Sequence, residues 1–181
     1  MISFLSPAYL TYPTLVPSLL AQTCRDWELV IGHDGECDEW EGWTQRYVDP
    51  RIRFRQTMER LGEFGHPIRE AFLSDEVLRG RYVVMTNHDN YFIPLAVSTL
   101  EQQTADVIAW PVLHNYFRYS VLHPRLSVGH IDLSSVAIRT DLARAIGFSW
   151  RDHDDDFSYI QEAAKMTSNW KFIEETLCVH N

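Results

Sequence analysis

The sequence predicts an α/β protein in which a mostly parallel sheet lies between two layers of helices. Three observations lead to this prediction. Short apolar runs alternate with amphipathic stretches through the first 110 residues, which is the β-α-β-α rhythm of a parallel sheet. Two of these runs lead into an aspartate, as strands do at the carboxyl edge of a sheet that binds ligands. The length of 181 residues fits one domain with a hydrophobic core.

The first half is expected to carry the parallel strands and the helices between them. Strands are predicted at residues 2–6, 28–31, 52–56, 82–85 and 107–110. Helices are predicted at residues 15–22, 38–47 and 68–78, and from Pro94 to about residue 103. Thr14 suits the N-cap of the first of these helices, and Pro17 is tolerated in its first turn. Gly80 is a suitable C-terminal stop for the third helix.

The second half departs from this rhythm. Residues 111–133 are rich in aromatic residues and histidine and have no helical period, which indicates a loop with an irregular antiparallel element over the sheet edge. A strand at 136–138 and a helix opened by Thr140 and ended by Gly147 follow. A helix at 156–165 and short strands at 170–173 and 176–179 complete the prediction. No linker interrupts the chain, so a single domain of residues 1–181 is expected.

Composition narrows the classes of function. The formal net charge of −9 and the pI of about 5.3 argue against nucleic-acid binding, which requires a basic surface. Cys24, Cys37 and Cys178 lack Cys-x-x-Cys spacing and are expected to be free thiols of a reducing compartment. The first residues lack the pattern of a signal peptide, and no apolar run approaches the roughly 20 residues of a membrane span. A cytoplasmic protein without an integral membrane segment is therefore expected.

The segment Asn87-His88-Asp89 is the most informative in the chain. It follows the apolar run at residues 82–85, so it is expected at the carboxyl edge of the sheet. A carboxylate at that position can hold a hard divalent cation, and the cation can hold phosphates. The alternative is a turn without a ligand, because Asn, His and Asp are all common turn residues.

Several short motifs follow one another in an order that is typical of one enzyme family. They are Pro7-Ala8-Tyr9, Leu19-Leu20-Ala21-Gln22-Thr23, Trp27-Glu28-Leu29, His33-Asp34-Gly35, Gly80-Arg81-Tyr82-Val83, Arg139 with Ile146-Gly147-Phe148, and Asp155-Asp156-Phe157. Together they resemble the family 2 glycosyltransferases of the GT-A type. The resemblance implies a GT-A, Rossmann-like three-layer α/β/α fold with a small antiparallel element. It also implies a nucleotide-sugar-binding half at residues 1–110 and an acceptor and catalytic half at residues 111–181.

The resemblance implies a set of donor-binding residues. They are Pro7, Tyr9, Asp34, Arg69, Asn87 and His88. Tyr9 can pack against the nucleotide base, Asp34 can accept a hydrogen bond from it, and Arg69 suits a phosphate or a base carbonyl. Asn87 replaces the usual first aspartate of Asp-x-Asp, so it can bind a ribose hydroxyl but brings no charge. The alternatives are a plain turn at Asp34 and an exposed helix charge at Arg69.

Metal and catalytic roles are implied in the same way. Asp89 matches the acid that reaches the metal, and His180 matches a late histidine ligand, with Mn²⁺ or Mg²⁺ as the ion. The alternative for His180 is a frayed terminal side chain. Asp156 matches the base that deprotonates the acceptor, and Asp155 is the second candidate, although acids that begin a helix also stabilise its dipole. Asp132 is a candidate for binding acceptor hydroxyls.

The function predicted from these residues is an inverting, metal-dependent transfer of a sugar from a nucleotide-sugar to an acceptor hydroxyl. The donor is expected to be UDP-linked, and the acceptor a glycan or another hydroxyl compound. Two alternatives remain open. His33 and Asn87 each stand where the resembled family has an acid. Their presence favours a GT-A-like module that binds nucleotide-sugars without catalysis. A phosphoesterase with His and Asp ligands is the third possibility. Three histidines, His114, His123 and His130, are too scattered in the sequence to predict a metal site.

Overall fold

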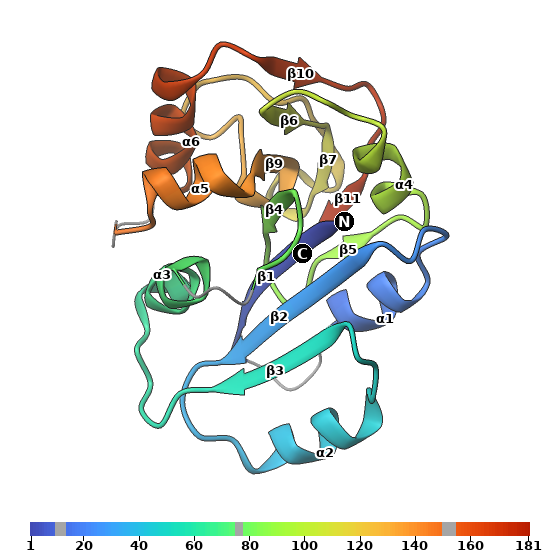
Figure 1. The fold of residues 1–181 in the computed structure, drawn as a ribbon, viewed down its shortest axis with the longest axis vertical. Coiled ribbons are helices and arrows are strands. Elements are labelled where there is room, and N and C mark those ends of the chain that lie inside the picture. The colour runs from blue at the N-terminus through green and yellow to red at the C-terminus, as the bar shows by residue number, and fades with distance from the viewer. Residues whose placement is uncertain (10–13, 75–77, 150–154) are drawn as a thin grey trace.

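A seven-stranded sheet forms the centre of the protein. The computed structural model describes residues 1–9, 14–74, 78–149 and 155–181 (Figure 1). The strand order is β10-β6-β9-β4-β1-β2-β3. Their bounds are β1 Ile2–Ala8, β2 Trp27–His33, β3 Ile52–Gln56, β4 Tyr82–Met85, β6 Val107–Ala109, β9 Val136–Arg139 and β10 Trp170–Phe172. Only β9 runs antiparallel to its neighbours β4 and β6, so the sheet is mainly parallel, as predicted.

Helices cover both faces of this sheet and complete the three layers (Figure 1). One face carries α1 (Leu15–Leu20), α2 (Asp38–Arg46) and α4 (Ala96–Glu101), and the other α3 (His66–Ser74), α5 (Thr140–Ile146) and α6 (Asp155–Met166). Side chains of β1 alternate between the two faces. Phe4 therefore packs in the cluster that contains Leu15 and Val97, whereas Leu5 packs with Leu73 and the residues of α5 and α6.

A second sheet of four strands lies beside the first, where the antiparallel element was expected. Its order is β5-β11-β7-β8, with β5 Tyr91–Phe92, β11 Cys178–His180, β7 Val112–His114 and β8 Ser120–Leu122. The 3-10 helices η2 (Asn115–Phe117) and η3 (Leu133–Ser135) contact this sheet, whereas η1 (Glu63–Gly65) directly precedes α3. The strand nearest the C-terminus, β11, is parallel to β7 and antiparallel to β5. Cys178 and Val179 are therefore held between two strands, and His180 pairs with His114 of β7.

Three residues that were predicted to begin or end a helix have other roles. Thr14 precedes α1 but does not cap it, because its hydroxyl donates to the carbonyl of Asp89. Gly80 does not stop α3, since Leu78 and Arg79 are already non-helical. Glycine is needed there because a Cβ atom would lie 2.5 Å from the amide nitrogen of Ser3. Thr140 is the first residue of α5 rather than its cap, and its hydroxyl donates to the Gly80 carbonyl.

The predicted end of α5 is confirmed. Gly147 ends α5 with a positive φ of 71°, a conformation that favours glycine. All three cysteines are free. Within the ranges that the structure describes, every helix is too short or too polar to cross a membrane.

Candidate active site

Two adjoining cavities open at the carboxyl edge of β1, β2 and β4. The Tyr9 cavity has a volume of about 470 Å³ and is lined by Tyr9, Asp34, His88 and Asp89, among others. The Asp156 cavity has a volume of about 350 Å³, and its lining includes Arg69, His114, Asp132, Asp156 and His180. Phe64 and Asn87 line both cavities. These two side chains therefore mark the boundary between the two cavities.

The Tyr9 cavity brings together residues from the ends of two parallel strands. Pro7 pairs with Gly32 and Ala8 with His33, so Tyr9 and Asp34 emerge at the same level. Half of the Tyr9 surface is exposed, and the Arg60 guanidinium lies 4.1 Å above its ring. The Asp34 carboxylate accepts hydrogen bonds from the amides of Leu61 (2.7 Å) and Gly62 (2.9 Å). Each of its oxygens retains a second lone pair for a ligand.

A strained loop separates the two cavities. Gly62, Glu63, Phe64 and Gly65 all have positive φ, with values of 67°, 46°, 54° and 77°. This conformation is costly for the two residues that carry a Cβ atom, and such strain clusters at functional sites. A Cβ atom on Gly65 would lie 2.4 Å from Cβ of Pro7, so this position requires glycine. The Phe64 side chain is 65% exposed, and it lines both cavities.

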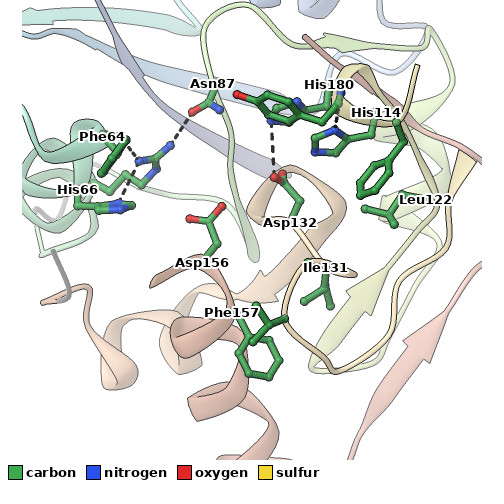
Figure 2. Close-up of a pocket in the computed structure, with 15 residues that line it drawn as sticks. Phe64, His66, Asn87, His114, Leu122, Ile131, Asp132, Asp156, Phe157 and His180 are labelled. Carbon is green, nitrogen blue, oxygen red and sulfur yellow. Dashed lines mark hydrogen bonds and ion pairs between the residues drawn. The ribbon is translucent and has the colours of Figure 1, made fainter. Parts of the chain in front are cut away.

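Arg69 links this loop to Asn87. Its Nη1 donates to the Phe64 carbonyl (2.7 Å) and its Nη2 to Oδ1 of Asn87 (2.6 Å) (Figure 2). Arg69 is only 4% exposed, so the alternative of an exposed helix charge is wrong. Burial lowers the pKa of Arg69, and the negative charges of Asp156 and Asp132 oppose that shift. Because Asn87 is neutral, these carboxylates across the cavity are the charges that balance the arginine.

His88 and Asp89 line the Tyr9 cavity. Oδ1 of Asp89 is buried and, among the described residues, has no hydrogen-bond partner. The Asp89 carbonyl is held by Thr14 and by the side chain of Asn181 (2.8 Å), which fixes the turn. Burial lowers the pKa of His88; the neighbouring Asp89 acts against this shift, and His33 adds to it. A carboxylate oxygen that lacks a donor is suited to a divalent cation such as Mn²⁺ or Mg²⁺.

Asp156 lies in the first turn of α6, and its carboxylate points into the cavity that bears its name. Figure 2 shows it directed toward the side where Asn87 and Asp132 lie. Asp155 begins the same helix, but its side chain, like all of Asp154, lies outside the described residues. Of the predicted catalytic pair, Asp156 is therefore the member with a described place in the site.

His180 joins a group that the sequence did not predict. His114, Asp132 and His180 each offer one ligand atom, and these atoms lie within 4.8 Å of one another. The two imidazole rings stack with centroids 4.1 Å apart and planes at 10°. Both histidines are 7% exposed, so the expectation of a frayed terminal side chain at His180 is wrong. The expected partner Asp89 is not in this group and lines the other cavity.

His114 was missed because its neighbour is far away in the sequence. The two histidines meet only through the parallel pairing of β7 and β11, which places His114 opposite His180. No short-range spacing in the sequence indicates that these two histidines lie together. Burial lowers the pKa of His114, the adjacent His180 lowers it further, and Asp132 opposes both effects. A lowered pKa favours the neutral imidazole that metal binding requires.

Comparison with known proteins gives structural neighbours alone. The chain matches no family model, and no curated sequence is significantly similar to it. It resembles a crystal structure of S. aureus TarS 1-349, with a TM-score of 0.79, 16% identity, and coverage of 99% of this chain and 60% of that one. TarS 1-349 in complex with UDP-GlcNAc gives a TM-score of 0.78 and 17% identity over 98% of this chain and 57% of that one.

A third structure, TarS 1-349 in complex with UDP, gives a TM-score of 0.77 and 16% identity over 98% of this chain and 59% of that one. This chain therefore spans less than two thirds of the length of these three structures. At such identities the likeness establishes the fold. The predicted GT-A-like α/β fold with a mainly parallel central sheet is confirmed.

Proposed function

We propose that this protein is a glycosyltransferase that moves a sugar from a UDP-linked donor to an acceptor hydroxyl. One observation carries the proposal: two adjoining cavities meet at Phe64 and Asn87, one with the features of a nucleotide site and the other with a carboxylate directed into it. The shared fold with TarS, crystallised with UDP-GlcNAc and with UDP, supports the choice of donor. Membership of family 2 is part of the same proposal and rests on the ordered motifs.

The donor is assigned to the Tyr9 cavity. The exposed ring of Tyr9 offers an apolar face to the uracil base, and Asp34 lies beside it with lone pairs to accept from the base N–H. Pro7 and His88 complete the wall, and Asn87 offers its amide to a ribose or sugar hydroxyl. Arg69 sits behind Asn87 as a buried cation and favours the approach of the negatively charged diphosphate.

A divalent cation, Mn²⁺ or Mg²⁺, is proposed to accompany the diphosphate. The unpartnered Oδ1 of Asp89 is the protein ligand that fits it, together with oxygens of the donor. When bound, such an ion neutralises the charge that develops on the leaving diphosphate. The substitution of aspartate by Asn87 leaves one carboxylate fewer than in the usual motif. The affinity for the cation is therefore expected to depend strongly on the presence of the donor.

The acceptor is assigned to the Asp156 cavity. Asp156 takes the proton of the acceptor hydroxyl as its oxygen forms a bond to the anomeric carbon. The bond between that carbon and the diphosphate oxygen breaks, and its electron pair leaves with the UDP. Attack from the side opposite the diphosphate inverts the anomeric configuration. The two substrates meet at Phe64 and Asn87, which line both cavities.

Two variants separate donor binding from chemistry. Titration calorimetry with UDP and Mn²⁺ should show binding to the unchanged chain and to Asp156→Asn, but much weaker binding to Asp89→Ala. Release of UDP from UDP-GlcNAc or another UDP-sugar should be lost in both variants. Binding without release from any UDP-sugar would instead favour the catalytically inactive binding module. Phosphate release from simple esters, without UDP binding, would favour the phosphoesterase.

A further inference from the structure

We propose that His114, Asp132 and His180 bind a transition-metal ion, with Zn²⁺ as the best match, separately from the cation expected at Asp89. The three ligand groups converge on the Asp156 cavity, whereas Asp89 lines the Tyr9 cavity. The protein would then hold one ion on the donor side and a different ion on the acceptor side.

The fold brings the three ligands together from distant parts of the chain. His114 and His180 are paired residues of β7 and β11, so their side chains leave the second sheet on the same face. Asp132 immediately precedes η3, and its Oδ1 accepts hydrogen bonds from the amide of Ser134 (2.7 Å) and from the Ser134 hydroxyl. These bonds fix the carboxylate so that Oδ2 faces His180 (Figure 2). Hydrogen bonds of this kind commonly orient the carboxylates that bind metals.

Within the described residues, neither ring nitrogen of His180 makes a hydrogen bond. Its Nδ1 is buried and has no hydrogen-bond partner among the described residues. Its Nε2 lies 3.6 Å from Oδ2 of Asp132, which is too long for a hydrogen bond. Buried polar atoms are nearly always satisfied in native proteins, so this nitrogen at a cavity wall is available to a ligand.

The ligand chemistry selects the ion. Two imidazoles and one carboxylate suit Zn²⁺ and its neighbours among the first-row metals better than Mg²⁺, which prefers oxygen ligands. Zn²⁺ binds at about 2.0–2.1 Å, so tetrahedral ligand atoms lie roughly 3.3 Å apart. The present spacing of up to 4.8 Å must therefore shorten by about 1.5 Å, which side-chain rotation into the cavity can supply.

The fourth coordination position would face the cavity that contains Asp156. Three protein ligands with one open position are typical of zinc sites that take part in chemistry. A hydroxyl bound there has a lowered pKa and gives up its proton more readily. The ion would thus bind the acceptor hydroxyl and make it a better proton donor to Asp156. This role rests on the proposed function, whereas the binding of the ion does not.

Calorimetric titration of Zn²⁺ into the metal-free full chain, without nucleotide, tests the site. One equivalent should bind. His180→Gln and Asp132→Asn should each weaken the binding by at least about tenfold. Asp132→Asn keeps an oxygen that can accept from the Ser134 amide, so it removes the charge while the η3 cap remains. Asp89→Asn is the matched control and should leave the Zn²⁺ affinity within about twofold of the unchanged chain.

Co²⁺ provides a second measurement, because its absorption spectrum distinguishes nitrogen and oxygen ligands from the thiolates of the free cysteines. Absence of a one-to-one binding event would overturn the inference, as would a site that Asp89→Asn removes and His180→Gln retains. Circular dichroism of the metal-free variants checks that they fold. If His180→Gln does not fold, Asp132→Asn alone decides the question. A chain that transfers sugar but binds no Zn²⁺ contradicts only this inference, and one that binds Zn²⁺ but no UDP contradicts only the proposed function.

Discussion

Replacement of Gly65 by alanine should disturb the loop that separates the two cavities. Gly65 has φ of +77°, and an added Cβ atom would lie 2.4 Å from Cβ and 2.6 Å from Cγ of Pro7. Both atoms belong to a rigid ring at the end of a buried strand, so the loop rather than β1 must move. Gly62 provides a matched control in the same loop. Its φ is +67°, but an added Cβ atom would meet nothing within 4 Å.

The two substitutions share one cost and differ in another. An alanine with positive φ costs about 1–2 kcal/mol, which applies to both Gly62→Ala and Gly65→Ala. The clash with Pro7 adds about 1–3 kcal/mol of overpacking at Gly65 alone. The free energy of unfolding should therefore fall by about 1–2 kcal/mol in Gly62→Ala and by about 2–5 kcal/mol in Gly65→Ala.

Urea denaturation followed by tryptophan fluorescence measures this difference, and titration with UDP measures its functional effect. Because the loop lines both cavities, displacement from Pro7 should weaken UDP binding more in Gly65→Ala than in Gly62→Ala. Equal destabilisation by the two substitutions would refute the reasoning, since it would mean that the contact with Pro7 does not restrain the loop. Undiminished UDP binding in a destabilised Gly65→Ala variant would refute its link to the donor site.

Three further perturbations test other contacts. Asp34→Asn keeps one side-chain oxygen, so one of the amides of Leu61 and Gly62 loses its acceptor. The free energy of unfolding should fall by about 1–3 kcal/mol, and calorimetry should show weaker UDP binding. Unchanged UDP affinity would remove Asp34 from the donor site. Lysine at position 69 lacks the forked guanidinium that donates to both the Phe64 carbonyl and Asn87. Hydrogen exchange of the loop amides should therefore be faster in Arg69→Lys. Unchanged exchange would mean that Arg69 does not restrain the loop. Burial acts to raise the pKa of Glu28, but hydrogen bonds from Ser3, the Arg79 amide and Arg53 outweigh it and hold that pKa below its ordinary 4.5. The native state thus binds fewer protons there, so the free energy of unfolding should fall as the pH drops below about 4.5. Glu28→Gln should flatten this fall in urea denaturation, and an unaltered pH profile would contradict the assignment.

The strands and helices of the first half could be predicted from the sequence because their signals are local. The strand at residues 52–56 and the helix that begins at Asp38 were predicted at or within one residue of their bounds. The region after residue 110 was harder, because its strands are short and pair over long distances. β11 pairs with β7, whose residues lie 66 positions earlier in the chain, and no period in either segment indicates that pairing.

In the candidate site too, some groupings of residues could be predicted from the sequence and others could not. Tyr9 and Asp34 follow neighbouring parallel strands, so their meeting at one edge could be expected from the sequence. The grouping of His180 with His114 and Asp132 could not, because it depends on the second sheet and on the turn before η3. Gly80 illustrates another limit. The residue looked like a helix stop, but the close approach of Ser3 requires it, and such a contact appears only when the strands are assembled.

The position of the nucleotide is the central claim, and nuclear magnetic resonance tests it directly. The ¹⁵N-labelled chain would be titrated with UDP and Mg²⁺, and amide shifts would be followed residue by residue. The account predicts that the largest changes occur at Tyr9, Leu61, Gly62 and Asp89. Shifts confined to another cavity, which Trp40 and Met58 line between α2 and β3, would contradict it.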